Sequence, residues 1–158
     1  MIEMYTDGAA QGNPGRGGYG TVLMAKSLGL RKEFSAGFRC TTNNRMELLA
    51  VIIGLEALKK PNMKVKVYSD SKYVVDAVEK KWVLGWEKKN FINKGETRLN
   101  ADLWKRFLEI YRKHQVTFQW VKGHAGIPEN ERCDELAVAA ASSSNLPADE
   151  YYEKYQMK

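Results

Sequence analysis

Three strand-like segments precede the first predicted helix, and the connections between them are short. They are Ile2–Thr6, a run near Gly20–Met24, and the alternating sequence LRKEFSAGF at residues 30–38. Strands joined by short connections pair antiparallel, because a parallel pair needs a crossover of about a dozen residues or more. Each of the two later strands follows a helix, which favours parallel pairing. The order therefore indicates an α/β fold whose five-stranded mixed sheet, flanked by helices, has three antiparallel and then two parallel strands.

After residue 42 the pattern alternates between helices and strands. The sequence predicts, in order, a helix over 43–58, a strand over 64–70, a helix over 71–80, a helix over 100–114, a strand over 116–121 and a helix over 128–141. The first of these helices is apolar on nearly every side, so we expect it to be buried. Pro128 suits the first turn of the last helix. We expect one domain over residues 1–141 and a loosely ordered tail over 142–158.

The composition is that of a basic globular domain. Of the 158 residues, 44% are hydrophobic and 28% are charged, and the net charge of +6 suits a polyanionic partner. Cys40 and Cys133 lack the spacing of a zinc site, and we expect free thiols in a reducing compartment. We find no signal-peptide pattern and no apolar run of membrane-spanning length. The expectation is a cytoplasmic monomer without a membrane partner.

Four carboxylates stand at the ends of the predicted elements. Asp7 and Asp70 end the first and fourth predicted strands, and sites in α/β sheets gather beyond the carboxyl ends of strands. Glu47 lies in the first turns of the apolar helix, and Asp134 lies on the apolar stripe of the last helix. A carboxylate on a buried apolar surface is costly unless it is paired or binds a metal.

Each carboxylate, taken alone, also has a purely structural explanation. These are a turn for Asp7, a capping box with Asn44 for Glu47, a helix cap for Asp70 and, for Asp134, an ion pair with Arg132 or another surface base. Four carboxylates facing one edge of a sheet favour a metal site instead. Oxygen ligands suit Mg²⁺ or Mn²⁺, and four negative charges balance two divalent ions, the arrangement used for in-line displacement at phosphorus.

Residues 80–94, which we call the basic segment, concentrate positive charge. Five lysines stand against the single acid Glu87, giving +4 of the chain's +6, with Trp82, Trp86 and Phe91 between them. The structural explanation is a short amphipathic helix whose tryptophans pack inward beneath a solvated lysine face. The functional interpretation is a protrusion that contacts duplex phosphates, with strongly salt-dependent binding.

His124 lies in a glycine-flanked loop ten residues before Asp134. A zinc-ligand role is disfavoured, since the only other histidine is His114 and neither cysteine lies close by. Carboxylates near an imidazole favour its charged form, which would keep it able to give or take a proton near neutral pH. The alternative is a surface histidine that happens to fall in a turn.

Five blocks of the sequence resemble the signatures of bacterial type 1 ribonuclease H. They are YTDGAAQGNPGRGGYG, TTNNRMELLAVIIGLEAL, YSDSKYV, NADLW and WVKGHAGIPENERCDELA, in order and at compatible spacing from Ile2 to Ala141. The resemblance implies a ribonuclease H-like fold and a metal-dependent endoribonuclease. Such enzymes cut the RNA strand of RNA–DNA hybrids and leave 3′-hydroxyl and 5′-phosphate ends.

The resemblance also implies roles for individual residues. The metal-binding carboxylates would be Asp7, Glu47, Asp70 and Asp134, holding two Mg²⁺ ions, with Mn²⁺ as a substitute. One ion, on Asp7, Asp70 and Asp134, would ready the attacking water, and the other, on Asp7, Glu47 and Asp70, would stabilise the leaving 3′ oxygen. His124 matches the loop histidine that assists catalysis.

The implied substrate contacts lie on several segments. Asn13, Asn43 and Asn44 match positions that contact the RNA strand, and Asn100 matches a position near phosphates of the DNA strand. Lys72 departs from the family, which commonly has glutamine there. The basic segment matches a substrate-binding handle formed by Lys80, Lys81, Trp82, Trp86, Lys88 and Lys89.

Two other functions remain open at the level of sequence. One is a non-catalytic module that binds hybrid or duplex RNA through the basic segment. Four intact carboxylates argue against it, because unneutralised negative charge repels phosphate. The other is a related nuclease of the same fold, such as a 3′ exonuclease or a DNA-resolving enzyme. The basic segment and the asparagines fit hybrid recognition better, since a carboxamide can both donate to and accept from a ribose 2′-hydroxyl.

Overall fold

The structure, a computed structural model, describes residues 1–157 and contains the predicted five-stranded mixed sheet. The strand order is β3-β2-β1-β4-β7. Strands β1, β2 and β3 pair antiparallel, whereas β4 pairs parallel with both β1 and β7. The bounds are Ile2–Ala10 for β1, Gly15–Ala25 for β2, Leu30–Thr41 for β3, Lys64–Ser69 for β4 and Gln115–Trp120 for β7. The fold class predicted from the sequence is confirmed.

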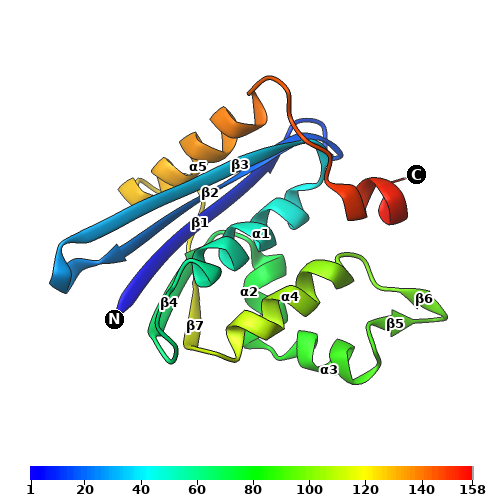
Figure 1. The fold of residues 1–158 in the computed structure, drawn as a ribbon, viewed down its shortest axis with the longest axis horizontal. Helices are drawn as coiled ribbons and strands as arrows, with labels where there is room; N and C mark the ends of the chain where they lie inside the picture. The colour runs from blue at the N-terminus through cyan, green and yellow to red at the C-terminus, as the bar shows by residue number, and fades with distance from the viewer. Residues whose placement is uncertain (158) are drawn as a thin grey trace.

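Helices cover both faces of the sheet (Figure 1). Helix α5 lies over the antiparallel strands on one face, and α1 lies on the opposite face with α2 and α4 beside it. The helices are α1 (Asn43–Glu56), α2 (Lys72–Glu79), α3 (Trp82–Lys88), α4 (Ala101–Tyr111) and α5 (Pro128–Ala141). A short hairpin of β5 (Ile92–Asn93) and β6 (Glu96–Thr97) extends beyond α3. Within residues 1–157, none of the helices has the length and apolar character needed to cross a membrane.

The main hydrophobic core lies around α1, as its apolar sequence predicts. Leu48, Val51 and Leu55 are fully buried there and join a cluster that includes Trp104 of α4. A smaller cluster beneath α5 contains Cys133, which is a buried free thiol. Because α1 is buried on nearly all sides, it is fixed relative to the sheet, and so are the polar residues of its first turns.

Two details differ from the sequence-based expectation. Strand β1 continues to Ala10 through its pairing with β2, so Asp7 lies inside β1 and not at its end. On α5, the buried stripe contains Cys133, Ala137 and Ala141, whereas Val138 is 48% exposed and Asp134 is only partly buried. The first difference arises because β2 pairs with β1 as far as Ala10, whereas β4 pairs with β1 only as far as Tyr5.

The C-terminal tail is packed against the domain, contrary to the expected loose order. Residues 149–157, which we call the C-terminal segment, include the short helix η2 (Tyr152–Gln156), and Asp149 and Tyr152 are buried. In Figure 1 the segment lies beside the start of α1. Its anchor is a buried ion pair with Arg45, a contact between residues far apart in sequence that local patterns do not reveal.

Candidate active site

The geometry of the sheet brings Asp7 and Asp70 together. The parallel pairing of β1 with β4 ends at Tyr5 opposite Tyr68. Asp7 lies two residues further along β1, and Asp70 lies two residues beyond Tyr68, just past the end of β4. Side chains two residues further along a strand point to the same face. The two carboxylates therefore lie side by side where β4 ends and β1 continues with β2 alone.

Glu47 reaches the same place from the first turns of α1. A Cβ atom added to Gly8 would lie 2.4 Å from the backbone nitrogen of Glu47, so only glycine lets α1 lie this close to β1. The backbone N–H of Gly8 donates to Glu47 Oε1 at 2.8 Å and to Asp7 Oδ1 at 2.9 Å. One backbone donor thus serves two carboxylates.

The three carboxylates Asp7, Glu47 and Asp70, which we call the acidic cluster, fit a metal site. Each offers an oxygen, and these oxygens all lie within 4.8 Å of one another. Glu47 Oε2 is buried and has no hydrogen-bond partner in the described part of the chain. No lysine or arginine among residues 1–157 forms an ion pair with any member. A cation would satisfy both the charge and the unpaired oxygen.

Burial and mutual repulsion disfavour the charged form of the cluster. Burial raises the pKa of Asp7 to about 6. Burial, reinforced by the nearby charges of Asp7 and Asp70, raises the pKa of Glu47 well above its ordinary value. Burial also raises the pKa of Asp70, with a smaller contribution from Asp134. Such shifts are typical of functional sites, and here they favour either bound protons or a bound cation.

Asp134 and His124 border the same pocket as the acidic cluster. This pocket has a volume of about 440 Å³, and we call it the catalytic pocket after the role that the sequence predicts for it. Asp134 is not within ligand distance of the other three carboxylates, yet its charge raises the pKa of both Asp7 and Asp70. The positive charge of His124 acts in the opposite direction on Asp70. A Cβ at Gly123 would lie 2.7 Å from Asp70 Oδ2, so glycine lets the His124 turn approach that carboxylate.

The structural explanations for the carboxylates fail one by one. Ser71 caps α2 by accepting from the backbone N–H of Val74 at 3.2 Å, so Asp70 is not the cap. Thr42 caps α1, which leaves Glu47 outside a capping box. The Arg132 guanidinium pairs with Glu33 and Glu135, not with Asp134. The carboxylates are therefore available for binding.

The predicted asparagines divide between two pockets. Asn43 and Asn44 border the catalytic pocket, whereas Asn13 and Asn100 border a second pocket that shares only Asn44 with the first. The Asn43 side-chain oxygen accepts from the backbone N–H of Ala10 at 2.6 Å, which turns its NH₂ group away from β1. Asn13 in turn accepts from the backbone N–H of Asn43 at 3.0 Å.

Lys72 lies at the rim of the catalytic pocket and contacts Trp120, which sequence analysis did not single out. Its Nζ is 5.0 Å from the centroid of the indole ring, whose Nε1 donates to the carbonyl of Asp70 at 3.2 Å. Tyr73 was missed in the same way, although it borders the catalytic pocket and accepts from both Asn100 and Trp104. Neither contact has a local sequence signal, because both join distant segments.

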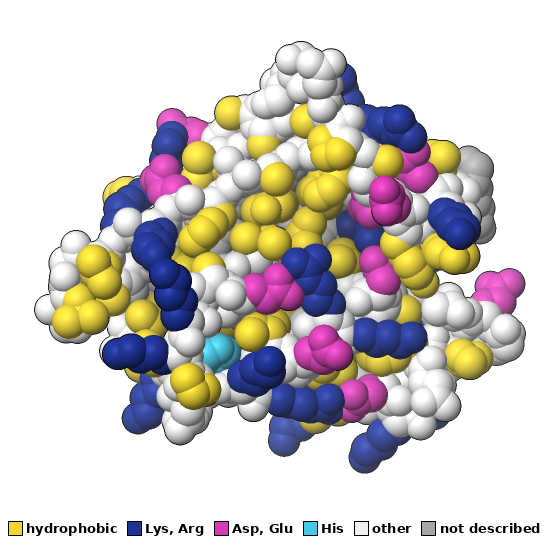
Figure 2. Space-filling view, viewed as in Figure 1, with side chains coloured by type: hydrophobic (Ala, Val, Ile, Leu, Met, Phe, Trp, Pro, Cys, Tyr) yellow, Lys and Arg dark blue, Asp and Glu magenta, His cyan; other side chains and the backbone are white. Residues whose placement is uncertain are grey.

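The basic segment combines packing with exposed charge. Trp86 packs edge-on against Trp104 of the core, and Phe91 is buried, whereas Trp82 is 47% exposed beneath the ammonium of Lys80. Glu87 is paired with Arg112, so the exposed lysines dominate the local charge. Figure 2 shows Lys and Arg side chains along the lower edge of the face on which α3 lies in Figure 1. The lysines of this segment lie outside the catalytic pocket, so any contact they make is with more distant parts of a ligand.

Comparison with known proteins identifies the family to which the chain belongs. Residues 1–142 match the family model for RNase H. The chain belongs to the ribonuclease H family. The resemblance to bacterial type 1 ribonuclease H is confirmed.

Individual ribonucleases H agree with this assignment. The ribonuclease H of Desulforamulus reducens is 61% identical over 149 residues, covering 94% of this chain and 92% of the relative. A crystal structure of a type 1 RNase H with the type 2 active-site motif superposes with a TM-score of 0.78 at 30% identity, covering 99% of this chain and 81% of that one. A ribonuclease H crystallised in complex with RNA/DNA hybrid has a TM-score of 0.68 at 28% identity, covering 89% of this chain and 96% of that one.

Proposed function

We propose that this chain is an endonuclease that hydrolyses the RNA strand of RNA–DNA hybrids with two Mg²⁺ ions. The observation that carries the proposal is the acidic cluster, with its unpaired Glu47 Oε2, in a chain of the ribonuclease H family. The related ribonuclease H in complex with RNA/DNA hybrid supports the choice of substrate. We further propose a cytoplasmic monomer, as expected from the sequence.

The acidic cluster would hold the metals, and Asp134 would complete the ligand set from α5. Mg²⁺ supplies Lewis-acid chemistry at such a site, activating water and stabilising a leaving oxygen, with Mn²⁺ as a substitute. Gly8 holds Asp7 and Glu47 in place through its single N–H. His124, at the rim beside Asp70, would deliver a proton to the leaving 3′ oxygen. The products would carry 3′-hydroxyl and 5′-phosphate ends.

The asparagines and lysines around the pocket would position the hybrid. Asn43 and Asn44 have carboxamides at the catalytic pocket, where they can donate to and accept from a ribose 2′-hydroxyl. Asn13 and Asn100, in the second pocket, would contact the nucleic-acid backbone. Lys72, held over Trp120, would meet a phosphate or a base edge.

One gel separates this proposal from its rivals. Labelled RNA–DNA hybrid, duplex DNA and duplex RNA are incubated with the protein, each with and without Mg²⁺. The proposal predicts internal cuts in the RNA strand of the hybrid, only with Mg²⁺. Binding without cleavage would support a non-catalytic module, and cleavage of duplex DNA or stepwise trimming from a 3′ end would support another nuclease of this fold.

Replacing Lys81, Lys88 and Lys89 together by alanine should weaken substrate binding more than catalysis. These exposed lysines lie on α3 or at its ends, away from the acidic cluster, so KM should rise more than kcat falls. The slope of log affinity against log salt should shrink by about one unit for each phosphate contact that is lost. Salt-dependent binding and steady-state kinetics measure both effects.

A matched control replaces Lys59, Lys60 and Lys64, which are also exposed but lie in the connection after α1 and at the first residue of β4. It removes the same charge from another part of the surface, so its salt slope should stay close to that of the wild type. If both triple variants change the salt slope equally, binding depends only on net charge, and the basic segment is not a dedicated substrate-binding surface.

Mg²⁺ should stabilise the protein more at pH 8 than at pH 5. The folded-state pKa of Asp7 is about 6 against an ordinary 3.8, so without metal the folded protein binds the extra proton and loses stability as pH rises through this window. A cation replaces that proton, and its benefit is therefore largest above pH 6. We expect the Mg²⁺-induced rise in Tm to be several degrees larger at pH 8.

Thermal melts at both pH values, with and without Mg²⁺, provide the measurement. The Asp7→Asn variant serves as the control, because it removes the titrating group and one metal ligand, and its Mg²⁺ response should be small at both pH values. An equal Mg²⁺ response at pH 5 and pH 8 in the wild-type protein would contradict this linkage.

A further inference from the structure

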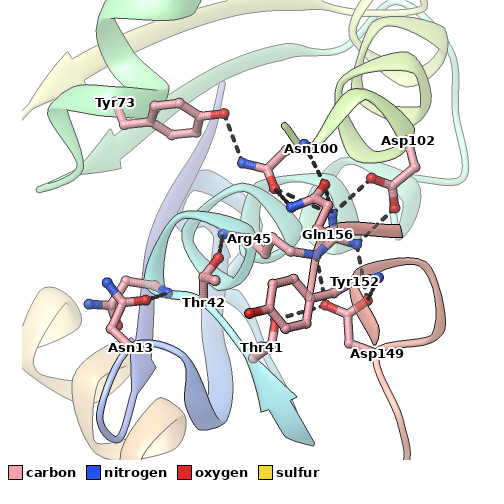
Figure 3. A network of polar contacts seen from close by, with 11 residues as sticks. Asn13, Thr41, Thr42, Arg45, Tyr73, Asn100, Asp102, Asp149, Tyr152 and Gln156 are labelled. Atoms are coloured by element: carbon pink, nitrogen blue, oxygen red, sulfur yellow. Dashed lines mark hydrogen bonds and ion pairs between the residues drawn. The ribbon is translucent and has the colours of Figure 1, made fainter. Parts of the chain in front are cut away.

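The C-terminal segment forms one wall of a pocket next to the catalytic one. This pocket has a volume of about 340 Å³ and is bordered by Asn13, Thr42, Asn44, Leu99, Asn100, Tyr152 and Gln156. The N-terminal ends of α1 and α4 both border this pocket, and so does the C-terminal segment, although it is distant from α1 in sequence (Figure 3). The pocket is therefore complete only when the segment is in place.

A buried guanidinium fixes the segment to the two helices. Arg45 is 2% exposed and donates from Nε to Asp149 Oδ2 at 2.7 Å and from Nη2 to Asp149 Oδ1 at 3.0 Å. It also pairs with Asp102 of α4 through two bonds of 2.8 Å, and Thr41 Oγ1 donates to Asp149 at 2.7 Å. Breaking a buried ion pair leaves an uncompensated charge, so the segment stays docked in the folded protein.

Gln156 of the docked segment forms two hydrogen bonds with Asn100, one through each polar atom of its carboxamide. Its Oε1 accepts from the backbone N–H of Asn100 at 2.7 Å, and its Nε2 donates to Asn100 Oδ1 at 3.2 Å. With Oδ1 held on this side, the Asn100 NH₂ group turns toward Tyr73, to which it donates at 3.0 Å. A carboxamide nitrogen carries two hydrogens, so one donor of Asn100 remains for a ligand.

We propose that Gln156 is a positioning residue, which sets the Asn100 side chain to receive the backbone phosphate that the family resemblance implies at this position. This inference rests on the proposed hybrid-cleaving function. The polar residues that border the pocket offer amide and hydroxyl groups and no carboxylate, and the pocket lies at the starts of two helices, where the helix dipole favours an anion. Because the pocket shares only Asn44 with the catalytic pocket, this phosphate is not the scissile one.

The Gln156→Glu variant tests the proposal with little change in shape. A glutamate still accepts from the Asn100 N–H and from Arg45, but it cannot donate to Asn100 Oδ1 and it adds negative charge to the pocket. We expect KM for hybrid to rise about tenfold, with kcat within about twofold of the wild type. The control Tyr155→Glu adds the same charge one residue away, at an exposed side chain outside the pocket, and should change neither value more than about twofold.

A scan with neutral linkages shows whether a phosphate is involved and which strand supplies it. Single methylphosphonates replace each phosphate of the DNA strand in one series and of the RNA strand in the other, and binding is measured in the Asp7→Asn background. We expect one linkage at which neutralisation weakens binding by the otherwise wild-type protein but not by Gln156→Glu. Such non-additivity is the signature of a direct or shared contact, and the series in which it occurs identifies the strand.

The proposal is overturned if, at every linkage of both strands, the loss of binding caused by the methylphosphonate simply adds to the loss caused by Gln156→Glu. It is also overturned if Tyr155→Glu raises KM as much as Gln156→Glu does. If Gln156→Glu melts well below the wild type, Gln156→Ala replaces it, and the same single linkage should lose its effect. Failure of the proposed function gives a different result, because the wild-type protein would then not cut the hybrid at all.

Discussion

Asp7→Asn should abolish hydrolysis of the RNA strand while hybrid binding is retained or strengthened. Asp7 contributes to the acidic cluster from β1 and shares the Gly8 N–H with Glu47, so its loss removes a charged ligand without changing the backbone. Metal-stabilised charge contributes several kcal/mol to such reactions, so kcat should fall about 10³-fold or more. Binding should persist, because one negative charge that repels phosphate is gone.

Single-turnover cleavage and equilibrium binding of the same hybrid measure the two effects separately. Glu3→Gln is the matched control, since it neutralises another carboxylate of β1 that lies outside the catalytic pocket and pairs with Lys26. The control should cut hybrid at nearly the wild-type rate. Wild-type cleavage by Asp7→Asn in Mg²⁺ would refute the two-metal proposal.

His124→Ala should lower kcat by roughly 10- to 100-fold with little change in KM, which is at or below the usual range for a general acid or base. His124 lies at the rim of the pocket, in a turn held against Asp70 by the small size of Gly123. From there it can reach a leaving group without contributing to the acidic cluster. It assists the metals and does not replace them, so the loss should be smaller than that of Asp7→Asn.

Steady-state kinetics on hybrid from pH 6 to pH 9 provide the measurement. His114→Ala is the control, because His114 accepts from the backbone N–H of Met63 and lies outside the catalytic pocket. If kcat of His124→Ala equals that of the wild type across the pH range, His124 is only a turn residue and takes no part in the reaction. A loss as complete as that of Asp7→Asn would mean that His124 is essential to the chemistry.

The sequence predicted the sheet and the carboxylates because both depend on short-range patterns. The close spacing of the first strands required antiparallel pairing, and the helices before the later strands required parallel pairing. The structure then placed Asp7 and Asp70 at the same offset beyond one strand pair, and Glu47 beside them on the buried helix. The association of Asp134 with this site also followed, although it lies further from the cluster than its predicted stripe implied.

The C-terminal tail shows where local patterns fail. Its polar sequence predicts loose order, yet Asp149 is buried in an ion pair with Arg45, which lies more than a hundred residues earlier. Arg45 is itself buried, and without Asp149 its charge would be paired with Asp102 alone. Nothing within either local segment indicates this pairing. The same holds for Gln156 with Asn100 and for Trp120 with Lys72.

The sequence alone determined which residue types are available for chemistry and the order of the elements that carry them, because hydrophobic period, turn residues and connection length act over short distances. Only the tertiary structure decided which of those residues meet. The 2.4 Å approach of α1 to Gly8 and the docking of the C-terminal segment on Arg45 depend on how the whole core is filled. Close packing fixes such contacts to fractions of an ångström, and it is a property of all the elements together and not of any one of them.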